Sequence, residues 1–471
     1  MMDPQDGAAM FELDGERFVR PDFSGRGLAN IAPTVLRLLA PRADQLNLPP
    51  LDESVLPAAL TDGVRTVVLI VADGLGHEQL EREIAAGNAP HLGEFLQRAG
   101  VTGQDKAPPA DGASQPRVDQ PRLDADAQQP RPGHGVQAGD HSVAYRPITS
   151  VFPTTTVAAL GSLNSGVTPV EHGLLGYTLY LREFDRASEM IRWGPLNRRI
   201  SYSDAEFGCT PESFFWAETL YARLQVAGVT RAFAVNPAHF GGTALTRMLH
   251  QGAEYRGYIA TSSVEPIVSR ILSDDTGNPT YVYAYWPTVD TISHLVGPLT
   301  PEHSAEVAAF DAFFGRLLQR LPRRGDTLVM LTADHGHVVT QPERELPFAE
   351  HPALLEMLRV LPVGERRAVY LHPRPGADDE VLDYARSRLR SEAAVTTRDD
   401  AVRLGLFGPG GLSERAAARI GEVLLFPRSN LQFVTPVQME DGTPMRVPAF
   451  RGLHGGLTAE EALVPLLAIR I

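Results

Sequence analysis

The chain has 471 residues, of which 43% are hydrophobic and 21% are charged, and it carries a formal net charge of −14. This composition is typical of a globular protein and excludes a chain that is disordered throughout. The negative charge argues against a protein that coats nucleic acids, because such proteins carry a basic surface. Cys209 is the only cysteine, which excludes a disulfide framework or a cysteine-based zinc knuckle.

The start of the sequence and the length of its apolar runs bear on where in the cell the protein is located. The acidic start lacks the basic end and apolar run of a signal peptide. No apolar run is long enough to span a bilayer. We therefore expect a cytoplasmic protein that does not bind a membrane.

Continuous apolar runs alternate with helical stretches along most of the chain. The runs at 65–72, 280–286 and 327–333 are typical of strands buried on both faces of a mostly parallel sheet, and 304–321 is typical of a helix. Residues 462–471 are expected to form another core strand. This alternation predicts a three-layer α/β/α sandwich.

Two segments interrupt the alternation. Residues 103–141 are rich in Pro, Asp, Gln and Gly and almost free of large apolar side chains, which predicts a disordered insertion. The periodicity changes between 346 and 449, which predicts a small α+β cap. The main domain would then comprise 1–102, 142–345 and 450–471.

Acidic and imidazole side chains follow the three internal strands. Asp73 follows the first, Asp290 and His294 follow the second, and Asp334 and His335 follow the third. The carboxyl ends of parallel strands meet at one edge of a sheet, so we expect these side chains to converge. Three carboxylates in one place would repel each other, which favours bound cations. Mixed Asp and His ligands indicate zinc, with manganese or iron as alternatives.

His454 is a further candidate ligand. It lies in a glycine-rich segment just before a helix start at Thr458, where Gly455 and Gly456 permit a close backbone approach. Taken singly, each candidate also has a structural explanation. An Asp at a strand end commonly caps the next helix, and Asp290 with His294 fits a surface pair on one helical turn.

Three threonines at 154–156 precede an apolar stretch that is typical of a helix start. A threonine there lies where backbone N–H groups and the helix dipole stabilise an anion, which suits a nucleophile. The alternative is that these threonines only cap the helix.

The order of Asp73, the threonine segment, Asp290-x3-His294, Asp334-His335-Gly336 and His454 resembles the alkaline phosphatase superfamily, in particular its nucleotide pyrophosphatase/phosphodiesterase branch. Members place the nucleophile ten residues before the glycine of a TG-like pair. Ser165-Gly166 occupies that position, and His172-Gly173 supports the register.

The resemblance implies that Thr156, and not Thr155, is the nucleophile. It also implies two divalent metal ions. One would be held by Asp73, Thr156, Asp334 and His335, and the other by Asp290, His294 and His454.

Two positions depart from the branch. Tyr177 stands where diesterase relatives carry a phosphate-binding asparagine, and its phenol is a possible donor to the substrate. Phe152-Pro153 lies before the nucleophile instead of after it, which indicates a divergent subgroup. The nucleophile motif of the sulfatase branch is absent. Lys106 is the only lysine, which disfavours monoesterases that bind phosphate through lysine.

The resemblance implies a metal-dependent hydrolase of phosphodiesters or nucleotide pyrophosphates that acts through a phosphothreonine intermediate on a small phosphate-ester or nucleotide substrate. The first alternative is a phosphomonoesterase or phosphonate hydrolase on the same site. The second is a non-catalytic, metal-binding regulatory module, which predicts a missing ligand.

Overall fold

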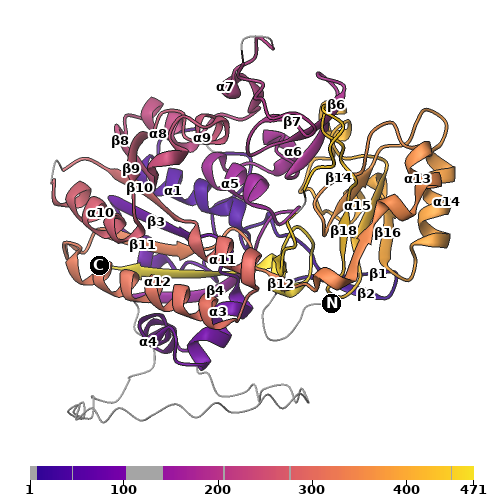
Figure 1. Cartoon of the computed structure of the whole chain (residues 1–471). Coiled ribbons are helices and arrows are strands. Elements are labelled where there is room, and N and C mark those ends of the chain that lie inside the picture. Colours follow the sequence, from indigo (N-terminus) through magenta and orange to yellow (C-terminus); the bar gives the residue numbers. More distant parts are fainter. Residues whose placement is uncertain (1–7, 45, 102–141, 205–206, 275–276, 447) are drawn as a thin grey trace.

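The computed structural model describes residues 8–44, 46–101, 142–204, 207–274, 277–446 and 448–471. The insertion predicted at 103–141 lies outside these residues. The described chain has a mixed α/β architecture in which helices surround a large sheet and a smaller sheet lies to one side (Figure 1).

The large sheet has seven strands in the order β4-β20-β11-β3-β10-β8-β9. They are β3 (Thr66–Ala72), β4 (Val143–Thr149), β8 (Arg231–Pro237), β9 (Glu254–Tyr258), β10 (Thr280–Trp286), β11 (Thr327–Thr332) and β20 (Leu463–Arg470). The strands from β11 to β9 are parallel, and β20 pairs antiparallel with both β11 and β4. The predicted mostly parallel sheet is confirmed.

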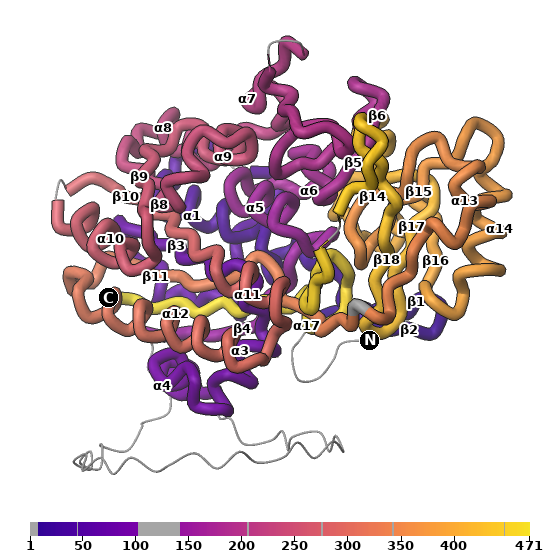
Figure 2. The backbone as a smooth tube through the Cα atoms, in the orientation of Figure 1, coloured from indigo at the N-terminus to yellow at the C-terminus, as the bar shows by residue number. Residues whose placement is uncertain are grey.

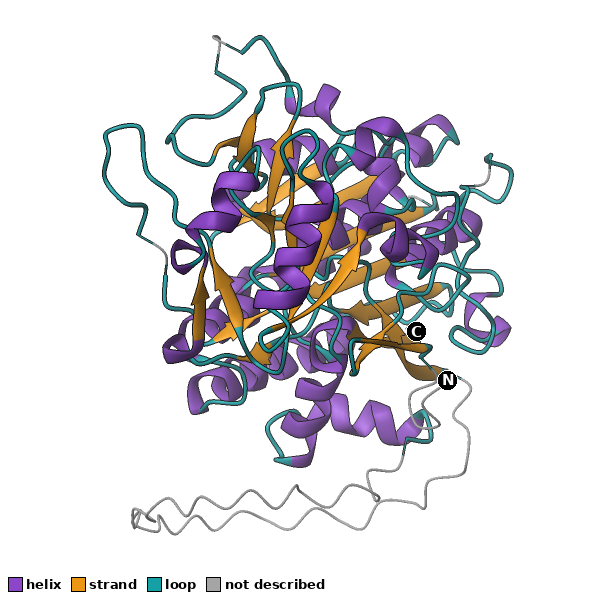
Figure 3. Cartoon of the chain, turned by 90° about the vertical axis from the view of Figure 1, so that its right-hand side faces the viewer, coloured by secondary structure: helices purple, strands orange, loops and turns teal. Residues whose placement is uncertain are grey.

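Helices cover both faces of this sheet and complete three layers (Figure 3). One group consists of α1 (Ile31–Leu39), α5 (Thr156–Ser165), α8 (Leu220–Val226) and α9 (Ala244–Leu249). The other consists of α3 (His77–Ala85), α4 (Pro90–Arg98), α10 (Val264–Ser273) and α12 (Pro301–Arg320). Shorter or connecting helices are α2 (Ala58–Thr61), α6 (Pro169–His172), α7 (Pro211–Phe214), α11 (Thr288–Val296) and α17 (Ala459–Ala462).

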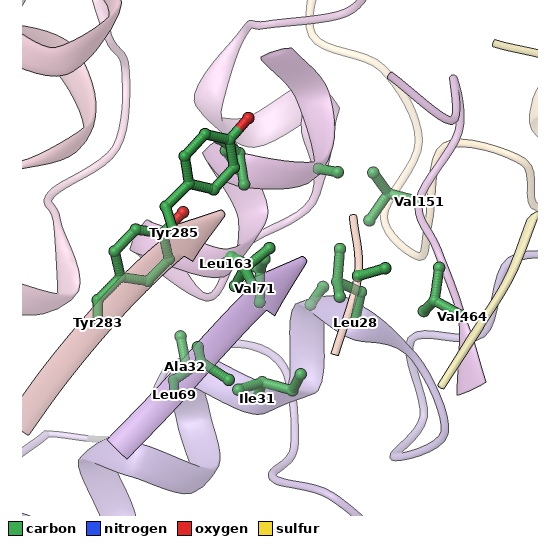
Figure 4. Close-up of a cluster of buried hydrophobic side chains, with 14 of the residues drawn as sticks. Leu28, Ile31, Ala32, Leu69, Val71, Val151, Leu163, Tyr283, Tyr285 and Val464 are labelled. Carbon is green, nitrogen blue, oxygen red and sulfur yellow. The ribbon is translucent and has the colours of Figure 1, made fainter. Parts of the chain in front are cut away.

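The central strands form because their residues are apolar or β-branched on both faces. Every residue of β3, β10 and β11 is buried. Leu69 of β3 pairs with Tyr283 of β10 and lies near Ile31 of α1 (Figure 4). Burying one such aliphatic side chain contributes about 1.5–3 kcal/mol. The register places the carboxyl ends of these strands side by side, so the residues that follow them share one edge.

The smaller sheet is antiparallel, with the order β16-β17-β15-β14-β5-β6-β7. Its strands are β5 (Thr178–Leu181), β6 (Arg186–Glu189), β7 (Gly194–Pro195), β14 (Val363–Gly364), β15 (Val369–Leu371), β16 (Ala393–Thr397) and β17 (Val423–Pro427). The helices α13 (Pro352–Met357), α14 (Asp378–Arg388), α15 (Arg398–Arg403) and α16 (Glu414–Ala417) belong to the same region.

The smaller sheet joins two distant parts of the sequence. Figure 2 shows β5 and β6 beside β14, and Gly364 pairs with Thr178. The range 346–449 predicted as a cap therefore supplies only part of this sheet, and the domain boundaries stay a prediction.

Three two-stranded sheets complete the fold of the described residues. They are β1 (Met10–Leu13) with β2 (Glu16–Val19), β12 (Val338–Val339) with β19 (Gly452–Leu453), and β13 (Glu345–Pro347) with β18 (Gln432–Val434). The β12–β19 pair brings the segment before His454 next to the segment after His335. Within the described ranges, no helix combines the length and apolar character that crossing a bilayer requires.

Candidate metal centre

The structure gathers the acidic and imidazole residues at the carboxyl edge of the large sheet. Asp73 directly follows β3, and its N–H donates to the carbonyl of Trp286 at the end of β10. Asp290 and His294 lie on α11, which follows β10, and Asp334 follows β11. The predicted convergence therefore has a local cause, because adjacent parallel strands end together.

The first cluster consists of Asp73, Asp334 and His335, whose ligand atoms lie close enough to share an ion. The Nε2 atom of His335 lies 3.5 Å from Asp73 Oδ1 and 3.5 Å from Asp334 Oδ2. The Oγ1 atom of Thr156 lies 3.2 Å from the same Nε2 atom. Asp334 is oriented by the N–H groups of Gly74 and His335, which donate to its Oδ1 at 3.1 and 3.0 Å. The four candidate ligands are therefore together.

The second cluster consists of Asp290, His294 and His454. Asp290 Oδ1 lies 3.3 Å from His294 Nε2 and 3.7 Å from His454 Nε2. The two Nε2 atoms are 3.2 Å apart. All seven ligands predicted from the resemblance thus lie in two adjacent clusters.

The histidine hydrogen bonds determine which ring nitrogen faces each cluster. The Nδ1 atoms face backbone carbonyls in the pairs His335 with Gly336 at 3.2 Å, His294 with Gly452 at 2.8 Å, and His454 with Thr154 at 2.9 Å. A carbonyl oxygen only accepts, so each Nδ1 carries the proton and each Nε2 presents a lone pair. Two facing lone pairs 3.2 Å apart repel each other unless a cation lies near both, and carbonyl-fixed histidines are typical of metal ligands.

The carboxylates also fit bound cations. Within the described chain, Asp73 Oδ1 and Asp334 Oδ2 are buried without a hydrogen-bond partner. Burial and the neighbouring charges of Asp334 and Asp290 raise the pKa of Asp73 well above its usual range. Burial acts in the same direction on Asp290, but the imidazoles around it hold its pKa well below the usual range. Divalent cations would satisfy the free oxygens and offset the repulsion.

Thr156 is the first residue of α5, and Thr155 is the N-cap residue. Thr155 makes no side-chain capping bond to the helix. The Thr154 hydroxyl donates to the Gly456 carbonyl at 2.8 Å. These contacts are not the ones expected if the threonines only capped the helix. The position of Thr156 leaves its hydroxyl facing the first cluster at the positive end of the helix dipole.

Tyr177 lies beside the site, but its phenol is engaged elsewhere. The residue is 39% exposed, and its phenol hydrogen-bonds to Glu189. Its backbone N–H donates to Glu365. The substrate-binding role of Tyr177 stays a prediction.

Sequence reasoning missed three residues at the site. His337 lies with Nε2 2.9 Å from Asp290 Oδ1, and burial lowers its pKa to about 3. Among the described residues its Nδ1 has no hydrogen-bond partner, unlike the Nδ1 atoms of the other three histidines, so its Nε2 can carry the proton and donate to Asp290. The Tyr285 hydroxyl donates to Asp73 Oδ2. Glu365 reaches the site from the smaller sheet. Alternation along β10 could have indicated Tyr285, whereas Glu365 carries no local signal.

A family model described as type I phosphodiesterase/nucleotide pyrophosphatase matches residues 67–457, a range that contains every residue of both clusters. The chain belongs to this family. The predicted relationship to the alkaline phosphatase superfamily is confirmed. No curated protein sequence matches the chain.

Solved structures share the fold of this family member at low sequence identity. Murine ectonucleotide pyrophosphatase/phosphodiesterase 5 is 15% identical with a TM-score of 0.55, and the match covers 85% of this chain and 87% of that one. The human protein is 16% identical with a TM-score of 0.54, again over 85% and 87%. Phosphonoacetate hydrolase from Sinorhizobium meliloti 1021 is 16% identical with a TM-score of 0.57 over 98% and 94%. The predicted enzyme class, a phosphodiesterase/nucleotide pyrophosphatase-like hydrolase, is confirmed.

Proposed function

We propose that the protein is a metal-dependent phosphodiesterase or nucleotide pyrophosphatase that uses Thr156 as its nucleophile. The observation that carries this proposal is the pair of adjacent ligand clusters beside the Thr156 hydroxyl, with three imidazole Nε2 lone pairs directed into them. The substrate would be a small phosphate diester or a nucleotide. The murine relative has a structure with AMP in which an inactive threonine-to-alanine variant was used, which supports both parts of the proposal.

Asp73, Thr156, Asp334 and His335 would hold one divalent ion, and Asp290, His294 and His454 the other. Zinc suits this mixture of oxygen and nitrogen donors, and manganese and iron are alternatives. When bound, the ions would supply positive charge to the phosphoryl group and to the leaving oxygen.

The residues of the chain would carry out two displacements. The Thr156 oxygen attacks phosphorus, the bond between phosphorus and the leaving oxygen breaks, and a phosphothreonine forms. Water then attacks the same phosphorus, and the threonine oxygen leaves. Backbone N–H groups at the start of α5 would stabilise negative charge on the attacking and departing oxygen.

Alanine variants of the two neighbouring threonines test the nucleophile. Thr156→Ala should abolish turnover of bis-p-nitrophenyl phosphate and leave the metal content near that of the wild type. Thr155→Ala is the matched control, because it removes the same hydroxyl one residue away and should retain measurable turnover. Full activity in Thr156→Ala, measured by release of p-nitrophenol, would reject the assignment.

A phosphomonoesterase or phosphonate hydrolase on the same residues is the second candidate. It is kept because the phosphonoacetate hydrolase shares the fold over 98% of this chain. Parallel assays of bis-p-nitrophenyl phosphate, p-nitrophenyl phosphate and phosphonoacetate would separate the candidates. The non-catalytic alternative predicts a missing ligand, and each position implied by the resemblance carries a suitable side chain. A cytoplasmic location stays a prediction from composition.

A further inference from the structure

The smaller sheet contributes a charged turn to the edge of the metal centre. Residues 365–368 connect β14 to β15, and the Glu365 N–H donates to the Ala368 carbonyl at 2.8 Å. The turn places Glu365 against Gly455, the residue after His454. A Cβ atom on Gly455 would lie 2.5 Å from the Cβ atom of Glu365, and Gly455 has a φ of 116°. The close approach therefore requires glycine at 455.

The Glu365 carboxyl accepts hydrogen bonds from two residues on the other side of the site. The backbone N–H of Tyr177 donates to Oε1, and the Thr155 hydroxyl donates to the same carboxyl group. Glu365 thus lies one residue from the proposed nucleophile along one segment and one residue from a candidate metal ligand along another. A phosphoryl group held between Thr156 and the two clusters would have this carboxyl as a neighbour.

The turn is held rigidly. Arg367 is buried and donates to both carboxylate oxygens of Glu461 at 3.2 Å, and also to the carbonyls of Ser429 and Leu431. Arg366 donates to the Gln432 side-chain oxygen and to the Pro448 carbonyl, which fixes the other side chain of the turn. The carboxyl of Glu365 therefore has a fixed place beside Thr155, the residue before the proposed nucleophile.

The fold does not explain why an acidic residue is present at 365. Burial, with a smaller contribution from Glu461, raises the pKa of Glu365 to about 8. Burying a carboxylate at this position costs more free energy than burying a neutral amide. The oxygen of an amide side chain could accept the same two hydrogen bonds. Costly ionisable groups that border an active site are candidates for a functional role.

We propose that Glu365 is a specificity-determining residue that selects monoanionic phosphodiesters and discriminates against dianionic phosphomonoesters. This inference rests on the proposed function. The physical cause is charge repulsion, which acts on every anion bound beside the carboxylate and is larger for a group that carries two charges. The inference extends the proposed function, because it assigns the choice between diester and monoester substrates to a residue outside both ligand clusters.

The test compares Glu365→Gln with the wild type at about pH 9, above the raised pKa, where p-nitrophenyl phosphate is fully dianionic. The ratio of kcat/KM for bis-p-nitrophenyl phosphate to kcat/KM for p-nitrophenyl phosphate should fall by about tenfold in the variant. Glu356→Gln removes the same charge from an exposed position on α13 and should leave the ratio unchanged. An unchanged ratio in Glu365→Gln would overturn the inference.

A second variant separates charge from shape. Glu365→Asp keeps the negative charge and should keep the preference for the diester. If Glu365→Asp lost the preference as far as Glu365→Gln does, charge would not be the cause.

Binding of inorganic phosphate to the metal-loaded proteins, measured by calorimetry at the same pH of about 9, needs no turnover. Phosphate should bind about tenfold more tightly to Glu365→Gln than to the wild type. If the wild type hydrolysed neither ester, the proposed function would fail, while unchanged phosphate affinity would overturn the role of Glu365 independently.

Discussion

Tyr285→Phe removes a single hydroxyl from beneath the metal centre. In the wild type this hydroxyl donates to Asp73 Oδ2, and both side chains are buried. The bond favours the ionised form of Asp73, against the burial and neighbouring carboxylates that raise its pKa. Without it, protons should compete more effectively with a metal ion for Asp73.

The size of the effect follows from the type of bond. A hydrogen bond to a charged group contributes about 1.5–3 kcal/mol, which corresponds to a loss of about 10- to 150-fold in metal affinity. Loss of an outer partner of a metal ligand typically has a similar effect, about 10- to 100-fold. We therefore expect weaker metal binding by Tyr285→Phe, with a larger deficit at lower pH.

Competition with a chromophoric chelator, followed at several pH values, measures this affinity directly. Tyr281→Phe is a matched control, because Tyr281 lies on the same strand and its buried hydroxyl has no hydrogen-bond partner in the described chain. Equal metal affinity in Tyr285→Phe and Tyr281→Phe would refute the reasoning.

Two further predictions concern stability. Arg367→Met should lower the free energy of unfolding by about 3–5 kcal/mol, because it leaves the buried Glu461 carboxylate without its cation, and urea denaturation with Arg366→Met as a comparison measures this loss. In the metal-free protein, Glu365→Gln should reduce the dependence of stability on pH. The raised pKa of Glu365, about 8, means that the folded state holds a proton which the unfolded state releases near its ordinary value of 4.5. The wild type therefore loses stability as the pH rises from about 5 to 8, by roughly 2–4 kcal/mol from this group, and the variant does not. An equal slope in both proteins would contradict the assigned pKa.

The elements that sequence could predict are those with a local cause. The runs that became β3, β10 and β11 are apolar throughout, and Asp73 and Asp334 follow β3 and β11 at a shared edge. The helix start at 154–156 could be predicted from its local pattern, and α5 begins at Thr156, whereas the choice of Thr156 among the three threonines came from the family resemblance. His454 could be proposed as a ligand because the adjacent glycines indicated a close approach of the backbone.

The remaining features depend on contacts between distant segments. Gly364 pairs with Thr178 and the Glu365 carboxyl meets Tyr177, and neither contact has a counterpart in hydrophobic periodicity. The role of Tyr177 was inferred from its position alone, whereas its phenol is bound by Glu189. Sequence patterns indicate which residues follow neighbouring strands at a shared edge of the sheet. They do not indicate which turn of another sheet contacts those residues.

The placement of β20 has a consequence for synthesis on the ribosome. This strand fills the gap between β4 and β11, so both strands keep an open edge until residues 463–470 have been translated. Open strand edges invite pairing with other chains, and β pairings between distant residues form slowly. His454 is translated shortly before this strand, so the second ligand cluster and the sheet become complete over the same short stretch of synthesis. Metal capture and completion of the core should therefore coincide during synthesis.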